Sequence, residues 1–117
     1  WVAVIYADWR TARAPHPDLV LEVALSSDDC DGILIDTFDK SPPSPVDLSC
    51  RKWIERARNA GRLVALGGGI DLDAIARLGP LKPDIFAVRG AACYDGNRHN
   101  DVDPSRVAQL ARAAALS

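Results

Sequence analysis

The stretch ILIDTFDK, residues 33–40, sets the pattern from which the fold is predicted. Its apolar start is followed at once by an aspartate and, four positions later, by a lysine. Three further short apolar runs occur at residues 2–7, 63–66 and 85–88. Short consecutive apolar runs of this kind, rich in β-branched residues, are typical of parallel strands that are buried on both faces. We therefore predict four such strands.

Between these runs, apolar residues recur with the period of a helix. Helices are predicted from about residue 17 to residue 26 and over residues 46–60, with Gly61 placed to end the latter. A short helix is expected after Asp71, and a last one at Asp103-Pro104, because aspartate is a favoured N-cap and proline a favoured first residue. The positions expected to face inward on the first and last helices are Leu19, Val20, Val23, Ala24, Val107, Leu110, Ala111 and Ala114.

The predicted order is therefore βαβαβαβα, with roughly 20 to 30 residues from strand to strand, as in a βα-barrel. The fold class is α/β with parallel βα units, and residues 1–117 are predicted to form one domain that makes up half of an eight-unit TIM barrel. A small, open, doubly wound sheet is the alternative. The segment SPPSP, residues 41–45, is expected to be a stiff loop. Because the chain enters a strand directly at Trp1, we expect further sequence upstream.

Composition excludes several classes of partner. The net charge of −2 lacks the basic excess that binding to nucleic acid or to an anionic membrane requires. No apolar run approaches the roughly 20 residues of a membrane span, and no signal peptide is visible. Cys30, Cys50 and Cys93 are too irregularly spaced for a zinc or disulfide framework, so a reduced, cytoplasmic chain is predicted. His16 and His99 lack a partner pattern, and no metal site is predicted.

Polar or very small residues follow each of the four predicted strands. Asp8 follows the first, Asp36 and Lys40 follow the second, the Gly67-Gly68-Gly69 triplet follows the third, and Arg89-Gly90-Ala91 follows the fourth. In parallel α/β folds these carboxyl ends meet at one rim, which is where ligands bind. The sequence therefore predicts a ligand site built from all four loops.

Asp36 and Lys40 are the catalytic candidates, because a carboxylate and an ammonium at a strand end can form a proton-transfer couple. Asp8 is a third catalytic candidate, for which a structural role is equally open. Small residues let backbone N–H groups approach an anion closely, so the candidate phosphate-binding residues are Gly67, Gly68, Gly69, Arg89, Gly90 and Ala91. The structural alternatives are a tight turn for the glycines, an Asx-turn or surface ion pair for Asp36, and a salt bridge for Arg89.

Several motifs resemble the (5-formylfuran-3-yl)methyl phosphate synthase family of methanofuran biosynthesis. These are YADWR at the end of the first strand, the D-T-x-x-K spacing of ILIDTFDK, the loop LGGGI, and VRGAAC followed by GNR. The resemblance covers essentially the whole chain and places it as the C-terminal half of the family's barrel. It implies condensation of two molecules of glyceraldehyde 3-phosphate, with loss of one phosphate and water and without a metal or organic cofactor.

The resemblance also implies roles for individual residues. Asp36 and Lys40 match the family's catalytic aspartate and lysine, and the loops at Gly68-Gly69 and Gly90-Ala91 match its phosphate-binding end. The family's Schiff-base lysine lies in the N-terminal half, so this chain is expected to lack it. We expect a partner N-terminal half-barrel or self-association, within a homo-oligomer. The alternatives are another phosphosugar barrel enzyme, such as an isomerase, and a non-catalytic half-barrel that binds a phosphate metabolite.

Overall fold

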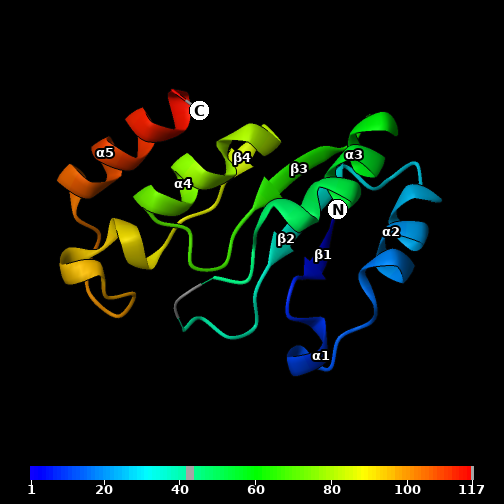
Figure 1. Ribbon diagram of the computed structural model, residues 1–117, viewed down its shortest axis with the longest axis horizontal. Helices are drawn as coiled ribbons and strands as arrows, with labels where there is room; N and C mark the ends of the chain where they lie inside the picture. Colours follow the sequence, from blue (N-terminus) through cyan, green and yellow to red (C-terminus); the bar gives the residue numbers. More distant parts are fainter. Residues whose placement is uncertain (42–43, 117) are drawn as a thin grey trace.

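The computed structural model describes residues 1–41 and 44–116 and contains a four-stranded sheet with helices along one side (Figure 1). All neighbouring strands are parallel, and their order along the sheet is β1-β2-β3-β4. The α/β class and the four predicted parallel strands are thereby confirmed. The strands are β1 (Val2–Tyr6), β2 (Gly32–Asp36), β3 (Leu63–Leu66) and β4 (Ile85–Phe86).

In the described residues, five α-helices and four short 3₁₀ turns connect or follow the strands. The helices are α1 (Trp9–Ala12), α2 (Pro17–Leu25), α3 (Arg51–Asn59), α4 (Leu72–Leu78) and α5 (Pro104–Ala115). Asp71 accepts a hydrogen bond from Ala74 N at 2.8 Å and Asp103 one from Ser105 N at 2.9 Å, so both predicted N-caps are confirmed. The 3₁₀ turns are η1 (Leu48–Cys50), η2 (Gly79–Leu81), η3 (Gly90–Ala92) and η4 (Tyr94–Gly96).

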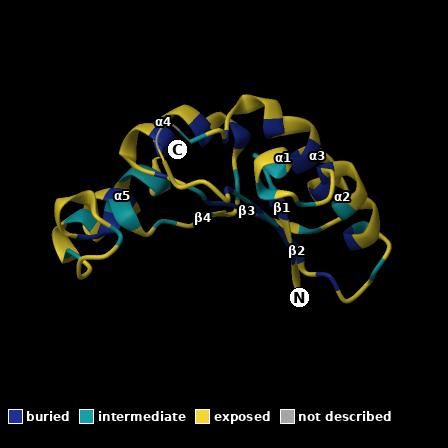
Figure 2. Ribbon diagram, turned by 90° about the horizontal axis from the view of Figure 1, so that it is seen from below, coloured by how far each residue is buried: buried dark blue, intermediate teal, exposed yellow. Residues whose placement is uncertain are grey.

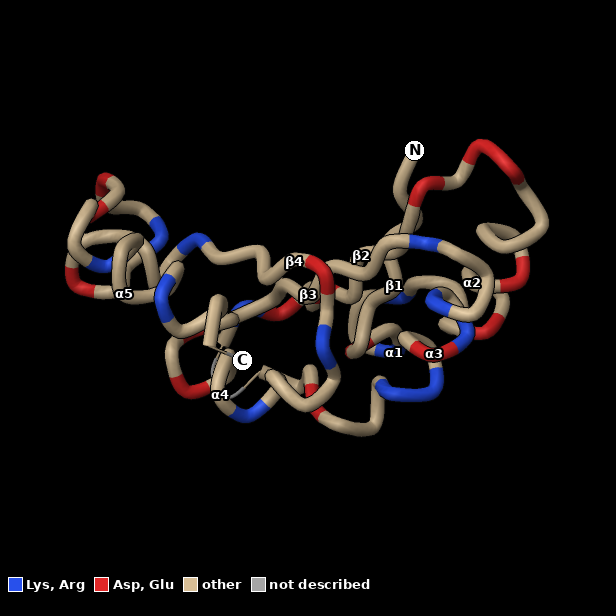
Figure 3. The backbone as a smooth tube through the Cα atoms, turned by 90° about the horizontal axis from the view of Figure 1, so that it is seen from above, with Lys and Arg blue, Asp and Glu red and all other residues tan. Residues whose placement is uncertain are grey.

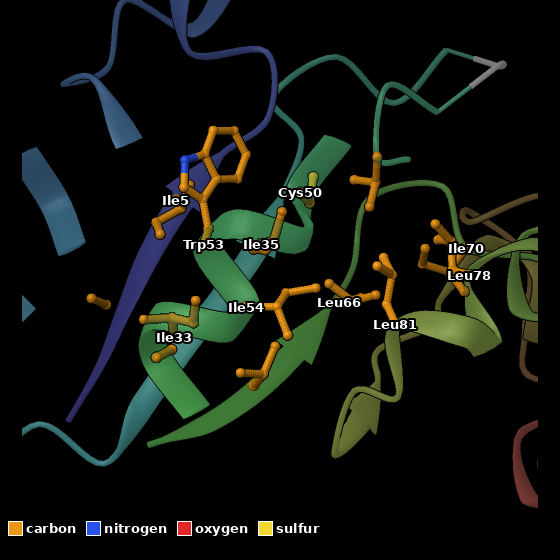
Figure 4. Close-up of a cluster of buried hydrophobic side chains, with 14 of the residues drawn as sticks. Ile5, Ile33, Ile35, Cys50, Trp53, Ile54, Leu66, Ile70, Leu78 and Leu81 are labelled. Carbon is orange, nitrogen blue, oxygen red and sulfur yellow. The ribbon is translucent and has the colours of Figure 1, made fainter. Parts of the chain in front are cut away.

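The hydrophobic core lies between the sheet and the helices of one side (Figure 4). Trp53 and Ile54 of α3 pack with strand residues that include Ile33, Ile35 and Leu66. Ile54, Ile35 and Leu66 are at most 2% exposed. Fully burying an aliphatic side chain of this size stabilises the fold by about 1.5–3 kcal/mol, so this layer is the main source of stability.

The opposite face of the sheet is not covered. Figure 2 shows α2, α3 and α4 on one side, and none of the described helices lies over the other. Side chains alternate across a strand, so Ala3 and Ile5 of β1 are buried while Val2 and Val4 are 53% and 41% exposed. In the described residues the strands are therefore buried on one face, and burial of the second face remains an expectation for the complete barrel. An apolar run does not reveal what covers each of its faces.

Some helix faces also differ from prediction. Leu19 and Val23 of α2 are 54% and 58% exposed, and Val107 of α5 is 42% exposed, although all three were expected to face inward. The buried residues of α2 are Pro17, Leu21 and Ala24, which follow one another at helical spacing on the face toward the sheet. β4 is also shorter than the predicted run, because its pairing with β3 stops at Phe86.

The sequential strand order and the one-sided helices are consistent with a segment of a βα-barrel. A doubly wound sheet reverses its strand order and carries helices on both faces, which differs from the arrangement of the described residues. The predicted stiff loop at 41–45 lies partly outside the described residues, which omit 42 and 43. Within the described chain, no helix is long and apolar enough to cross a membrane.

Candidate functional site

A cavity of about 880 Å³ lies at the carboxyl ends of β2, β3 and β4, on the uncovered face of the sheet. Its position follows from side-chain alternation, because Leu34 and Asp36 line it while their neighbours Ile33 and Ile35 point into the core. The structure brings eight of the nine predicted site residues to its wall, all except Asp8. The lining consists of Leu34, Asp36, Lys40, Gly67 to Asp71, Ala87 to Ala91, Gly96, Asn97, Arg98 and Arg106.

An ion pair between Asp36 and Lys40 forms one wall of the cavity. Asp36 is the last residue of β2, and its Oδ1 accepts from Lys40 Nζ at 2.9 Å and from Thr37 N at 2.8 Å. The ammonium also donates to the carbonyl oxygen of Thr37. The Lys40 and Asp36 side chains are 37% and 26% exposed, so both remain accessible from the cavity. A donor and an acceptor of protons are thus held together at the strand end.

The glycine triplet brings the β3 loop close to this ion pair. A Cβ on Gly67 would lie 3.6 Å from Oδ1 of Asp36, so the absence of a side chain keeps the space beside that carboxylate open. Gly68 and Gly69 have φ values of +84° and +72°, a backbone region in which glycine is strongly favoured. The N–H groups of Gly68, Gly69 and Ile70 have no hydrogen-bond partner among the described residues. The loop therefore presents free donors at the cavity.

The start of α4 adds less to anion binding than the sequence suggests. Asp71 caps this seven-residue helix with its own carboxylate, which accepts from Ala74 N and brings a negative charge to the same end. An anion at the cavity would therefore depend on the loop amides and on arginines rather than on the helix end.

Three arginines also contribute to the cavity lining. Arg89, Arg98 and Arg106 line the cavity, and several basic stretches lie at the end of the molecule that carries α5 (Figure 3). Arg106 Nε lies 3.7 Å from Oδ2 of Asp103. Arg89 and Arg98 have no acidic partner within 4.0 Å among the described residues. Unpaired guanidinium groups beside free N–H donors are suited to phosphate or carboxylate.

Sequence reasoning did not assign Arg98, Asn97 or Arg106 to the site. The segment 96–98 reaches the cavity because the loop after η3 folds back, and a Cβ on Gly90 would lie 3.4 Å from the Gly96 carbonyl oxygen. Such a fold-back leaves no periodic signal. The sequence feature that pointed to Arg98 was its place in the motif GNR. For Arg106, the corresponding feature was its position in the first turn of a helix that starts beside the site.

Asp8 lies outside the cavity lining. Its Oδ1 accepts from Phe38 N and its Oδ2 from Asp39 N, both at 2.9 Å. Partial burial raises the pKa of the Asp8 carboxyl, but the hydrogen bonds from the Asp39 and Phe38 backbone outweigh this and leave the pKa below its ordinary value. This geometry is that of a carboxylate that holds a loop.

No group of three or more His, Cys, Asp or Glu side chains in the described residues is placed to hold a metal ion. The cavity instead combines a carboxylate–ammonium pair, free amide donors and arginines. Parallel α/β proteins typically bind small ligands beyond the carboxyl ends of their strands, and this cavity lies at that position.

Comparison with known proteins identifies the family within this class. The model of the 4-HFC-P synthase family matches residues 1–111, so this chain belongs to that family. Relatives named (5-formylfuran-3-yl)methyl phosphate synthase include one from Methanocaldococcus jannaschii, 32% identical over 114 residues, and one from Methanococcus aeolicus, 36% identical over 102 residues. A third, from Archaeoglobus fulgidus, is 31% identical over 116 residues.

These alignments cover 93%, 84% and 96% of this chain but 48%, 43% and 48% of the respective relatives. The chain thus spans about half the length of the curated relatives that it matches. The resemblance drawn from YADWR, ILIDTFDK, LGGGI and VRGAAC is confirmed at the level of the family.

Proposed function

We propose that this chain contributes a proton-transfer couple and a phosphate site to a (5-formylfuran-3-yl)methyl phosphate synthase. The observation that carries the proposal is that the Asp36–Lys40 ion pair, two arginines (Arg89 and Arg98) and the Gly67–Gly69 loop line one cavity. A non-catalytic binder would gain little from a carboxylate–ammonium pair that faces the ligand. The family membership of the chain supports the same function.

The proposed substrates are two molecules of glyceraldehyde 3-phosphate. Their condensation forms the furan ring and its aldehyde and releases one phosphate and two molecules of water, in a carbon–oxygen lyase reaction of the class I aldolase type. Arg89, Arg98 and the free N–H groups of the glycine loop would hold a substrate phosphate. The Schiff base would form on a lysine contributed by another part of the complete enzyme.

Within this reaction, the Asp36 carboxylate is the proton acceptor and the Lys40 ammonium is the proton donor. Elimination of phosphate requires removal of a proton from a carbon next to the carbonyl and delivery of a proton to the departing oxygen. The two groups lie 2.9 Å apart, so a proton taken up by one is readily returned through the other. Such a couple contributes typically two to four orders of magnitude in rate.

We further propose that the uncovered face of the sheet is the interior of a (βα)₈ barrel. Val2, Val4, Leu63 and Ile85 all lie on this face and are 41–54% exposed. Leaving apolar surface in water costs about 25 cal/mol per Å². Four further βα units of an N-terminal half-barrel would cover these side chains. The relatives are roughly twice as long as this chain, which supports such a second half.

The experiment is to incubate the complete protein with glyceraldehyde 3-phosphate and to follow furan absorbance, with the mass of the product as a check. Formation of (5-formylfuran-3-yl)methyl phosphate supports the proposal. Conversion of the same substrate into an isomer would favour an isomerase of the phosphosugar barrel class. Binding of the triose phosphate without turnover would favour a binding protein.

A further inference from the structure

We propose that Asp8 is a positioning residue, which clamps the backbone at Phe38 and Asp39 and thereby holds the Lys40 ammonium against Asp36. The clamp itself follows from the geometry of the described residues, and its consequence for turnover rests on the proposed function. No motif of the sequence assigns this role to Asp8.

The clamp joins two segments that are far apart in the chain. The two Asp8 oxygens accept from Phe38 N and Asp39 N, 30 and 31 positions away. One step earlier along the same two segments, Ala7 N donates to the Asp36 carbonyl oxygen at 2.9 Å. These three hydrogen bonds fasten the end of β1 to the residues that immediately precede Lys40.

The remaining hydrogen bonds of residues 37–41 are local. Asp36 Oδ1 accepts from Thr37 N, and Asp39 Oδ1 accepts from Ser41 N at 2.8 Å and from Ser41 Oγ at 2.6 Å. Bonds between residues one or two positions apart shape a turn but do not fix where the turn lies relative to the sheet. Of the hydrogen bonds described for residues 37–41, those to Asp8 tie this part of the loop to the segment that follows β1.

A direct part in proton transfer fits Asp8 poorly. Both of its oxygens are already engaged with backbone donors, and it does not line the cavity. The lowered pKa agrees with a carboxylate that stays ionised as an acceptor. Lys40 lies one residue beyond the clamped pair, so a shift of this backbone moves the ammonium directly. Misplacement of a reacting group by about 1 Å can cost on the order of 100-fold in rate.

The test compares Asp8→Asn with Asp8→Glu and with the control Asp28→Asn in the complete protein. Asparagine is nearly isosteric with aspartate, but its amide nitrogen cannot accept a hydrogen bond. One of the two backbone hydrogen bonds to this side chain is therefore lost. Glutamate retains two acceptor oxygens. Asp28 is an exposed acidic residue with no described hydrogen bond to its side chain.

The first readout is independent of activity. Amide hydrogen exchange at Phe38 and Asp39 should accelerate by roughly tenfold or more in Asp8→Asn, as expected for loss of a bond to a charged acceptor, and not in Asp28→Asn. The chemical shifts of the Lys40 side chain should change in the same variant. In the wild type, the amide proton shifts of Phe38 and Asp39 should follow the ionisation of Asp8, a measurement that needs no variant to fold.

The second readout is turnover of glyceraldehyde 3-phosphate. We expect Asp8→Asn to lower kcat by about 10- to 100-fold with little change in KM, and Asp8→Glu to recover part of it. Loss of kcat with unchanged amide exchange and unchanged Lys40 side-chain shifts would overturn the positioning role in favour of direct catalysis. If the amide proton shifts of Phe38 and Asp39 do not change as Asp8 ionises, the proposed clamp is refuted. If the amide and Lys40 readouts respond as expected but the wild type makes no furan, the clamp is retained and the proposed function is refuted.

Discussion

Gly68 of the β3 loop lies directly against Thr37 of the β2 loop. A Cβ on Gly68 would come within 2.7 Å of both the Thr37 backbone nitrogen and its Cγ2, and Thr37 is itself 1% exposed. The two loops that carry the glycine triplet and the Asp36–Lys40 pair are therefore packed as one unit. Their relative position does not depend on flexible side chains.

Gly68→Ala should destabilise the protein more than Gly61→Ala. Both glycines have positive φ, +84° and +73°, so both substitutions carry backbone strain. A Cβ at Gly61 meets nothing within 4 Å, whereas one at Gly68 must displace Thr37. We expect an additional loss of about 1–3 kcal/mol in the free energy of unfolding for Gly68→Ala, measured by urea denaturation. Equal losses in the two variants would contradict the close packing.

Asp36→Asn and Lys40→Ala should each lower turnover by about two to four orders of magnitude, because each removes one member of the proton-transfer couple. The melting temperature should change little, since both side chains are partly exposed and their ion pair is a weak source of stability. Lys52→Ala, at an exposed position on α3, is the control and should keep its activity. A variant of Asp36 that loses stability but keeps turnover per folded molecule would make Asp36 a structural residue.

Arg98→Gln should weaken the binding of inorganic phosphate to the complete protein by about tenfold or more, as expected for loss of a charge-assisted hydrogen bond. Arg112→Gln is the matched control, because Arg112 is an exposed arginine in the last turn of α5 and does not line the cavity. Isothermal titration calorimetry measures both variants. Equal phosphate affinity in the Arg98 variant and the wild type would remove Arg98 from the anion site.

Lowering the pH should remove the contribution of the Asp8 hydrogen bonds to the stability of the protein. The pKa of the Asp8 carboxyl lies below its ordinary value of 3.8, so its stabilising contribution is present above that pH and is lost as the pH falls through the folded-state pKa. The stability difference between wild type and Asp8→Asn should therefore shrink as the pH falls from about 5 to about 2. The urea unfolding midpoints of both proteins across this pH range test the prediction. A stability difference between them that is constant with pH would argue against the clamp.

The strand-end candidates could be predicted from sequence because they follow directly from alternation and chain direction. Asp36 and Gly67 each come at the end of an apolar run, and parallel strands bring such ends together. Arg98 could not be placed in the same way, since it reaches the cavity through a loop that folds back on Gly90. The structural role of Asp8 depends on backbone donors 30 and 31 residues away, which no local pattern reveals.

Hydrophobicity alone does not distinguish the two faces of the sheet. Val4 and Ile5 look alike in the sequence, yet Ile5 is fully buried beneath the helices and Val4 is 41% exposed. Hydrophobicity indicates that a residue is suited to burial but does not identify what buries it. In the proposed barrel, Val4 would be covered by strands that lie outside this chain.

The central proposal is that this chain forms half of a barrel enzyme, in which the Asp36–Lys40 couple works only when the other half is present. The most direct measurement is the rate of furan formation from glyceraldehyde 3-phosphate by residues 1–117 alone, by the N-terminal half of a family member alone, and by the two mixed. We predict no activity in either half and activity in the mixture, with residues 1–117 alone self-associated because of the exposed face formed by Val2, Val4 and Leu63. A monodisperse, cooperatively unfolding monomer of residues 1–117 that remains inactive with every N-terminal half would contradict the account.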